Sequence, residues 1–203
     1  MWEEAEKYLS KDKYIGPLIK KHGPCKIKKR AKKYYFEDLV ASIVGQQLSG
    51  KAAMTIYGRV EKELGGEIVP DKILRKHDKT LRKCGLSYAK ISYIKDLSRH
   101  VKEGKLHIST LDKHTDEEVF EELVAVKGIG RWTADMFLMF VLARPDIFPM
   151  GDLGINKGFK LLTKKDLEPE KMEKFALRWK PYRTVASWYI WRNLDFLTFD
   201  QVK

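Results

Sequence analysis

A glycine turn and a single aspartate are the residues best suited to chemistry in this chain. Gly128-Ile-Gly130 lies between two apolar helical patterns, at residues 115–126 and 131–142. A glycine turn that leads into a helix exposes backbone N–H groups, and such groups bind phosphate. Asp152 follows within the segment Phe148-Pro-Met-Gly-Asp-Leu-Gly-Ile155. A phosphate-binding turn together with one carboxylate predicts chemistry on nucleic acid.

The charge of the chain agrees with a polyanionic partner. The 203 residues carry a formal net charge of +12, with a pI near 9.5. Such an excess favours nucleic acid first and an anionic membrane second. A lysine-rich solvated surface is the alternative interpretation, and it applies equally to the basic segment 20–33. Apolar residues make up 43 % of the chain, enough for a hydrophobic core.

The cysteines and histidines exclude the common metal centres. Cys25 and Cys84 form no CxxC or Cys/His cluster, and the five histidines have no ligand spacing. Neither a zinc site nor an iron–sulfur cluster is therefore predicted, and no cofactor is expected. Two thiols suit a reducing cytosol, and no stretch reads as a signal peptide or membrane span. A cytoplasmic, DNA-associated protein is the expectation.

The elements that must position the turn and the aspartate are helices. The apolar spacing i, i+3, i+4, i+7 from Phe36 to Leu48 predicts a core-facing helix, and no segment alternates as a strand does. Within the second of the two helical patterns beside the glycine turn, residues 132–142 are apolar nearly all round, which predicts a buried helix. The fold class is all-α. Further starts and stops are predicted at Ser49, Gly65-Gly66, Gly85, Ser87, Thr115, Asp152, Pro169 and Pro181.

Four segments in this order resemble the helix-hairpin-helix DNA glycosylases, most closely their 3-methyladenine DNA glycosylase II branch. The hairpin Gly128-Ile-Gly-Arg-Trp-Thr-Ala134 with Gly151-Asp152 carries the resemblance. The family's early core helix is matched by Phe36-Glu-Asp-Leu-Val-Ala-Ser-Ile-Val-Gly-Gln-Gln-Leu-Ser49. Its loop that enters the duplex is matched by Gly85-Leu-Ser-Tyr-Ala-Lys-Ile91. Its C-terminal helix is matched by Trp179-Lys-Pro-Tyr-Arg-Thr-Val-Ala-Ser-Trp-Tyr-Ile-Trp191.

The resemblance implies one unit of two helical lobes with a DNA-binding cleft between them. Residues 36–145 would form the central lobe, and residues 1–35 with 146–203 the second. The implied activity is base excision repair, in which a flipped-out alkylated purine of the 3-methyladenine or 7-methylguanine type is removed by hydrolysis. Asp152 aligns with the catalytic aspartate of the family, although a helix N-cap is the alternative role.

The position after the hairpin separates two kinds of chemistry. Relatives with lyase activity place a nucleophilic lysine where this chain has Trp132, so a monofunctional enzyme is implied. Trp132 and Trp191 match aromatic pocket positions, and Met136 follows one turn after Trp132. Indole rings favour cationic purines through cation–π contacts. Core packing is the alternative interpretation for both tryptophans.

The resemblance also implies DNA and cation contacts. The loop around Leu86 and Ser87, with Tyr88, would supply the wedge that fills the gap left by the flipped base. The carbonyls of Val124, Val126 and Ile129 would bind a sodium or potassium ion. Contacts to the backbone or to the DNA near the lesion are expected from Lys127, Gly128, Gly130, Arg131, Thr133 and Gln47.

Two other functions remain compatible with the sequence. A non-catalytic DNA-binding module would use the same hairpin and need Asp152 only as a helix cap. A glycosylase for hypoxanthine, uracil, oxidised purines or ethenoadenine would need more leaving-group activation than one carboxylate supplies. In either case the expected partner is double-stranded DNA, bound by a monomer.

Overall fold

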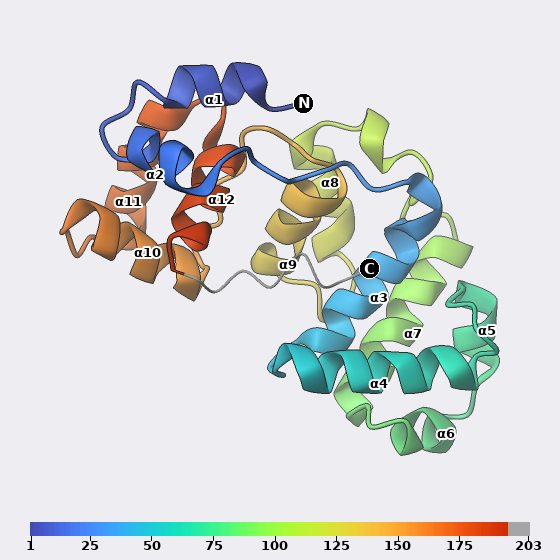
Figure 1. Cartoon of the computed structure of the whole chain (residues 1–203). Helices are drawn as coiled ribbons and strands as arrows, with labels where there is room; N and C mark the ends of the chain where they lie inside the picture. Colours follow the sequence, from blue (N-terminus) through green and yellow to red (C-terminus); the bar gives the residue numbers. More distant parts are fainter. Residues whose placement is uncertain (195–203) are drawn as a thin grey trace. The chain divides into compact units, whose positions relative to one another are not determined.

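The computed structural model describes residues 1–194, and residues 195–203, part of the expected second lobe, lie outside the described residues. Within 1–194 the chain forms twelve α-helices with short 3-10 and π segments and no strand (Figure 1). The predicted all-α fold is confirmed. No helix in this part of the chain is both long and apolar enough to cross a bilayer.

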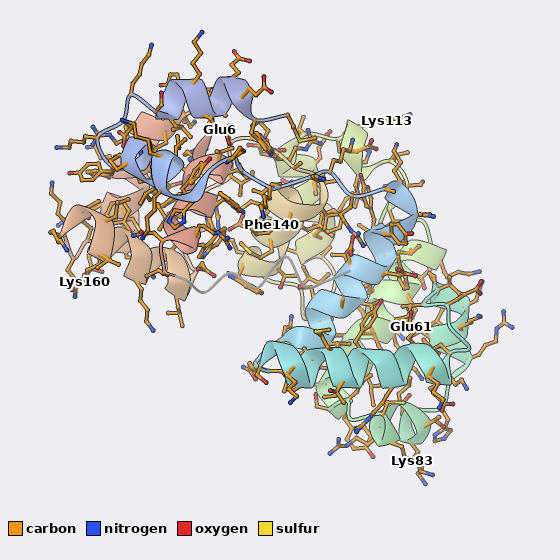
Figure 2. The ribbon with its side chains drawn as sticks, viewed as in Figure 1. Glu6, Glu61, Lys83, Lys113, Phe140 and Lys160 are labelled. Atoms are coloured by element: carbon orange, nitrogen blue, oxygen red, sulfur yellow. The ribbon has the colours of Figure 1, made fainter. Side chains whose placement is uncertain are left out.

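The chain divides into two compact units. Unit 1 joins Met1–Lys29 to Leu138–Lys203, and unit 2 is Arg30–Phe137. The lobes expected from the sequence had their boundaries at 36 and 145. Cationic side chains lie on the surface of both units, and Lys83 and Lys160 point away from the ribbon (Figure 2).

Unit 2 is built around helix α3 (Tyr35–Gly45), whose apolar face is buried. This helix packs against α4 (Gly50–Glu63) and α7 (Tyr88–Lys102), and the short helices α5 (Pro70–Arg75) and α6 (Asp78–Lys83) contact α7. The expected continuation of α3 to Leu48 is wrong. The helical path ends at the C-cap Gln46, whose ψ of 129° is extended; Gln47 follows with a left-handed φ of 57°, and Leu48 is exposed.

The predicted caps of unit 2 are confirmed. Ser49 and Ser87 accept hydrogen bonds from the backbone N–H groups of Ala52 and Lys90 at the starts of α4 and α7. Thr115 forms a capping box with Glu118 at the start of α8 (Asp116–Val124). Each cap satisfies N–H groups that have no partner within the helix.

The apolar stretch after the hairpin is shorter as an α-helix than expected. Helix α9 covers Arg131–Met136 and continues directly as a π-helix, Phe137–Val141, so one α-helix over 131–142 is a wrong prediction. The segment ends where Ala143 takes a φ of 54° and Arg144 donates its N–H to Leu138 O at 2.9 Å. The boundary between the two units falls within the π-helix.

Unit 1 gathers around α12 (Arg183–Arg192), which contacts α1 (Glu3–Leu9), α2 (Ile15–His22) and α10 (Leu153–Thr163) (Figure 1). Helix α11 (Pro169–Ala176) begins at the proline predicted to start it. Aromatic rings fill this core in edge-on pairs, for example Phe159 with Phe175 at 5.1 Å. Gly158 permits close approach, because a Cβ there would lie 2.5 Å from Ile190 of α12.

Candidate functional site

The hairpin turn of unit 2 requires glycine at its first position. Gly128 has a φ of +84°, and an added Cβ would lie 2.2 Å from the ring of Tyr93 on α7. Both the left-handed backbone and the contact with the ring exclude a side chain. Gly130 is the N-cap of α9, with a φ of −101° and no atom within 4 Å of an added Cβ. The two glycines therefore have different roles: one fits the turn against α7, and the other leaves the helix start open.

Two polar groups from other elements brace the hairpin. The Gln46 side chain donates to the carbonyl of Gly128 at 2.8 Å, and the Lys127 N–H donates to Asp96 Oδ2 at 2.9 Å. The Gln46 turn is itself held by Lys90, whose Nζ donates to the carbonyls of Val44 and Gln46, each at 2.7 Å. Burial lowers the pKa of the Lys90 amino group. The turn that would present N–H groups to phosphate is thus held on two sides.

Sequence reasoning missed these braces. Gln46, Tyr93 and Asp96 have no local signal that links them to the hairpin, since the contacts join α3 and α7 to a turn far along the chain. The adjacent Gln47, which was expected to contact DNA, is exposed and does not share this bond. The backbone turns left-handed at Gln47, so the Gln46 side chain faces the hairpin while the Gln47 side chain faces solvent.

Helix α9 offers some of its expected residues to solvent and buries others. Trp132 is 42 % exposed, Arg131 and Lys127 are exposed, and Met136 is half-buried. Thr133 is buried, so its hydroxyl is enclosed by the core of the unit, and its expected contact with DNA stays a prediction.

Asp135 is a buried carboxylate on the same helix. The residue is only 5 % exposed, and the cation that it faces, Arg131 Nε, lies 3.9 Å away. Burial raises the pKa of Asp135 to about 6, and Arg131 opposes the shift. In the described part of the chain no hydrogen bond to this carboxylate is formed. Arg131 therefore offsets only part of the cost of burying the charged carboxylate.

Asp152 lies at the start of α10 in unit 1, as its expected capping role requires. Its backbone is extended, and Oδ1 accepts a hydrogen bond from the Ile155 N–H at 2.8 Å. The same oxygen accepts a second hydrogen bond from Trp191 Nε1 at 2.7 Å. The carboxylate is partly exposed, so it is held in place without being enclosed. Capping and chemistry are therefore compatible at this residue.

Trp191 was expected as a stacking surface for the base, and that role stays a prediction. The residue is 5 % exposed, and its ring packs at 5.6 Å from that of Phe140. Little of the indole face is left for a base, whereas its N–H edge is committed to Asp152. Of the two expected pocket tryptophans, only Trp132 presents substantial surface.

Of the expected wedge residues, Leu86 is enclosed by the core. It is fully buried, and its carbonyl accepts a hydrogen bond from Arg82 at 3.0 Å. Its role as a wedge stays a prediction. Tyr88, two residues later, is 62 % exposed, and Ser87 is exposed as the cap of α7. The loop thus presents an aromatic side chain where the leucine was expected.

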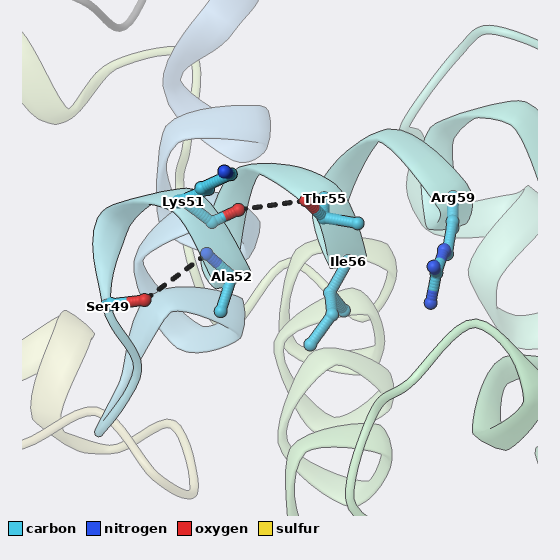
Figure 3. Close-up of a pocket in the computed structure, with 6 residues that line it drawn as sticks. All are labelled: Ser49, Lys51, Ala52, Thr55, Ile56 and Arg59. Atoms are coloured by element: carbon cyan, nitrogen blue, oxygen red, sulfur yellow. Dashed lines mark hydrogen bonds between the residues drawn. The ribbon is translucent and has the colours of Figure 1, made fainter.

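A shallow hollow of about 380 Å³ runs along α4 in unit 2 (Figure 3). It contains none of the predicted site residues. Its polar edge includes the Ser49 cap, and its two cations, Lys51 and Arg59, are exposed. Such a surface suits contact with an anion, but it holds no group arranged for chemistry.

Comparisons with family models and with individual proteins point to the same family. The model of the HhH-GPD superfamily of base excision DNA repair proteins matches residues 40–183. The alkylbase DNA glycosidase-like protein mag2 of Schizosaccharomyces pombe is 32 % identical, over 94 % of this chain and 93 % of that protein.

Two solved structures agree over almost the whole chain. The DNA-3-methyladenine glycosidase of Bacillus halodurans has a TM-score of 0.84 and 37 % identity, covering 98 % of this chain and 92 % of that one. The 3-methyladenine DNA glycosylase Mag1 of Schizosaccharomyces pombe, solved in complex with abasic DNA, also has a TM-score of 0.84, with 32 % identity over 98 % and 100 % of the two chains. This chain therefore belongs to the HhH-GPD superfamily of base excision DNA repair proteins, and these relatives lie in its 3-methyladenine glycosylase branch.

Proposed function

We propose that the protein is a monofunctional DNA glycosylase that hydrolyses the N-glycosidic bond of a flipped-out alkylated purine. The observation that carries this proposal is the Asp152 carboxylate, held at the start of α10 by two N–H donors and still partly exposed. Cleavage of the bond develops positive charge on the sugar, and a fixed carboxylate stabilises that charge or orients the attacking water. The names of the relatives support the same class of substrate.

Trp132 supports both the substrate class and the absence of lyase chemistry. Its exposed indole ring can stack on a cationic base such as 3-methyladenine or 7-methylguanine, a contact worth roughly 0.5–2 kcal/mol. An indole cannot form a Schiff base with the sugar, as a lysine at this position would. Met136, one turn further along α9, would add an adaptable apolar surface for the base.

Duplex DNA with a damaged base is the proposed partner, bound by a monomer in the cytoplasm. The N–H groups of Gly128 and Gly130 would contact phosphate, assisted by the exposed Lys127 and Arg131. Gln47 would contact DNA near the lesion. Tyr88, rather than Leu86, would fill the space left by the flipped base, with Ser87 beside it.

A monovalent cation at the hairpin is part of the same proposal. Carbonyls at the C-terminal end of α8 have no partners within the helix, and its dipole favours positive charge there. The Val126 carbonyl accepts the Ile129 N–H at 3.1 Å and retains a second lone pair that it could offer to sodium or potassium. Together with the carbonyls of Val124 and Ile129, it would hold the turn in shape.

The test is base excision from duplexes that carry one 7-methylguanine, one 3-methyladenine analogue or one hypoxanthine. Wild type is compared with Asp152→Asn, which keeps a capping side chain, and with Asp166→Asn as a matched exposed control. We expect excision to fall by about 10²–10³-fold in Asp152→Asn only, as for loss of a charge-stabilising group. Strand breaks should appear only after hot alkali. Excision that survives Asp152→Asn, or nicking without alkali, would contradict the proposal.

A further inference from the structure

The N–H edge of Trp191 approaches one oxygen of Asp152 where Gly154 carries no side chain. Trp191 Nε1 lies 2.7 Å from Oδ1, closer than the capping N–H of Ile155 at 2.8 Å. A Cβ on Gly154 would lie 2.9 Å from Trp191 Cδ1 and 3.0 Å from Oδ1. The absence of a side chain at residue 154 is therefore what lets the indole reach the carboxylate.

The indole itself has little freedom to move. Trp191 is buried on α12 and its ring packs against Phe140. One turn further along α10, Gly158 allows close approach to Ile190, the residue next to Trp191. The two helices are thus fixed against each other at the point where the indole donates its hydrogen bond.

We propose that Trp191 is a positioning residue that sets the orientation of the Asp152 carboxylate through its indole N–H. A capping bond from Ile155 fixes where Oδ1 lies, but a single bond leaves the carboxylate plane free to turn about it. A second donor from another helix removes that rotation and so fixes the direction of Oδ2. Catalysis depends on such orientation, and a displacement of about 1 Å costs about 10²-fold in rate. The inference rests on the proposed function of Asp152.

The sharpest test replaces Trp191 by 3-benzothienylalanine, in which sulfur takes the place of the indole N–H and the shape is retained. We expect the single-turnover rate of excision to fall by about 10- to 100-fold, with an unchanged Kd for abasic duplex. The same replacement at Trp188, a buried neighbour on α12, is the matched control and should leave both values unchanged. Normal excision by the Trp191 analogue would overturn the inference, as would parallel losses of rate, DNA binding and thermal stability.

A second variant approaches the contact from the other helix. Gly154→Ala places a methyl group against the indole and Oδ1, so its rate should fall with little change in Kd. Gly58→Ala in α4 is the control, because a Cβ there has no neighbour within 4 Å. Equal rates for the two alanine variants would overturn the inference.

An NMR measurement tests the hydrogen bond between Trp191 and Asp152 independently of excision activity. In Asp152→Ala the indole ¹⁵N–¹H signal of Trp191 should move upfield, while the signals of the other four of the five tryptophans stay in place. An unmoved signal would overturn the inference. A wild type that excises no alkylated base while the signal does move would overturn the proposed function and leave the hydrogen bond established.

Discussion

The hairpin of unit 2 and the start of α10 in unit 1 are both helix N-termini, yet they are stabilised in opposite ways. The α9 start has a glycine cap with no side-chain hydrogen bond, and its turn is shaped by Tyr93, Gln46 and Asp96 from other elements. The α10 start is capped by its own Asp152 carboxylate. The proposed phosphate contact of the hairpin needs open N–H groups, so the stability of this turn has to come from other elements.

The two regions also differ in their aspartates. Asp135 beside the hairpin is buried, no hydrogen bond reaches its carboxylate from residues 1–194, and its pKa rises to about 6. Asp152 is partly exposed and accepts two N–H groups on one oxygen. An aspartate thus lowers stability beside the hairpin, whereas at the start of α10 it is an ordered and accessible anion.

The largest effect on this comparison is expected from Gly128→Ala. The variant combines a left-handed backbone with a contact of 2.2 Å to Tyr93, so the free energy of unfolding should fall by about 2–5 kcal/mol. Urea denaturation measures the change. Gly130→Ala is the control for stability and should lose less than about 1 kcal/mol. Equal losses would show that the turn does not depend on its contact with α7.

The next effect is the pH dependence introduced by Asp135. Its pKa in the folded state, about 6, is above the ordinary value of 3.8, so the folded state binds the proton more tightly than the unfolded state does. The contribution to stability is therefore present at low pH and is lost as the pH rises through 6. Asp135→Asn should exceed wild type by up to about 3 kcal/mol at pH 8 and match it below about pH 4. Parallel curves from pH 4 to 8 would contradict this.

A smaller effect separates capping from chemistry at Asp152. Asp152→Ala removes the acceptor for the Ile155 N–H and should lower the free energy of unfolding by about 0.5–2 kcal/mol. Asp152→Asn keeps a capping oxygen and should remain close to wild type in stability. Chemical denaturation of both variants beside wild type gives the answer. Equal stability of the two would mean that the α10 start is held by other contacts.

The smallest effect concerns the brace on the hairpin. Gln46→Ala removes the hydrogen bond to the Gly128 carbonyl and should cost about 0.5–1.5 kcal/mol of stability. Gln47→Ala, on an exposed side chain, should cost less than about 0.5 kcal/mol. If Gln47→Ala proves the more destabilising of the two, the assignment of the brace to Gln46 is wrong.

Local signals in the sequence determined several helix starts, although not the ends of α3 and α9. The caps at Ser49, Ser87, Thr115 and Asp152 follow from hydrogen bonds within a few residues of each other. The apolar periodicity of α3 likewise predicts its buried face. Such features can be predicted because the groups that stabilise them are neighbours along the chain.

Tertiary structure decided which of the candidate residues are accessible and what holds them. Leu86 and Tyr88 both lie in the loop that was expected to enter DNA, but only packing against the core of unit 2 determines that the leucine is buried. Trp191 became a partner of Asp152 because α10 and α12 approach closely at Gly154 and Gly158. These outcomes depend on contacts between residues far apart in sequence. The residue types and their spacing indicate the chemistry, whereas the burial and the hydrogen-bond geometry of each residue are determined only when the helices pack.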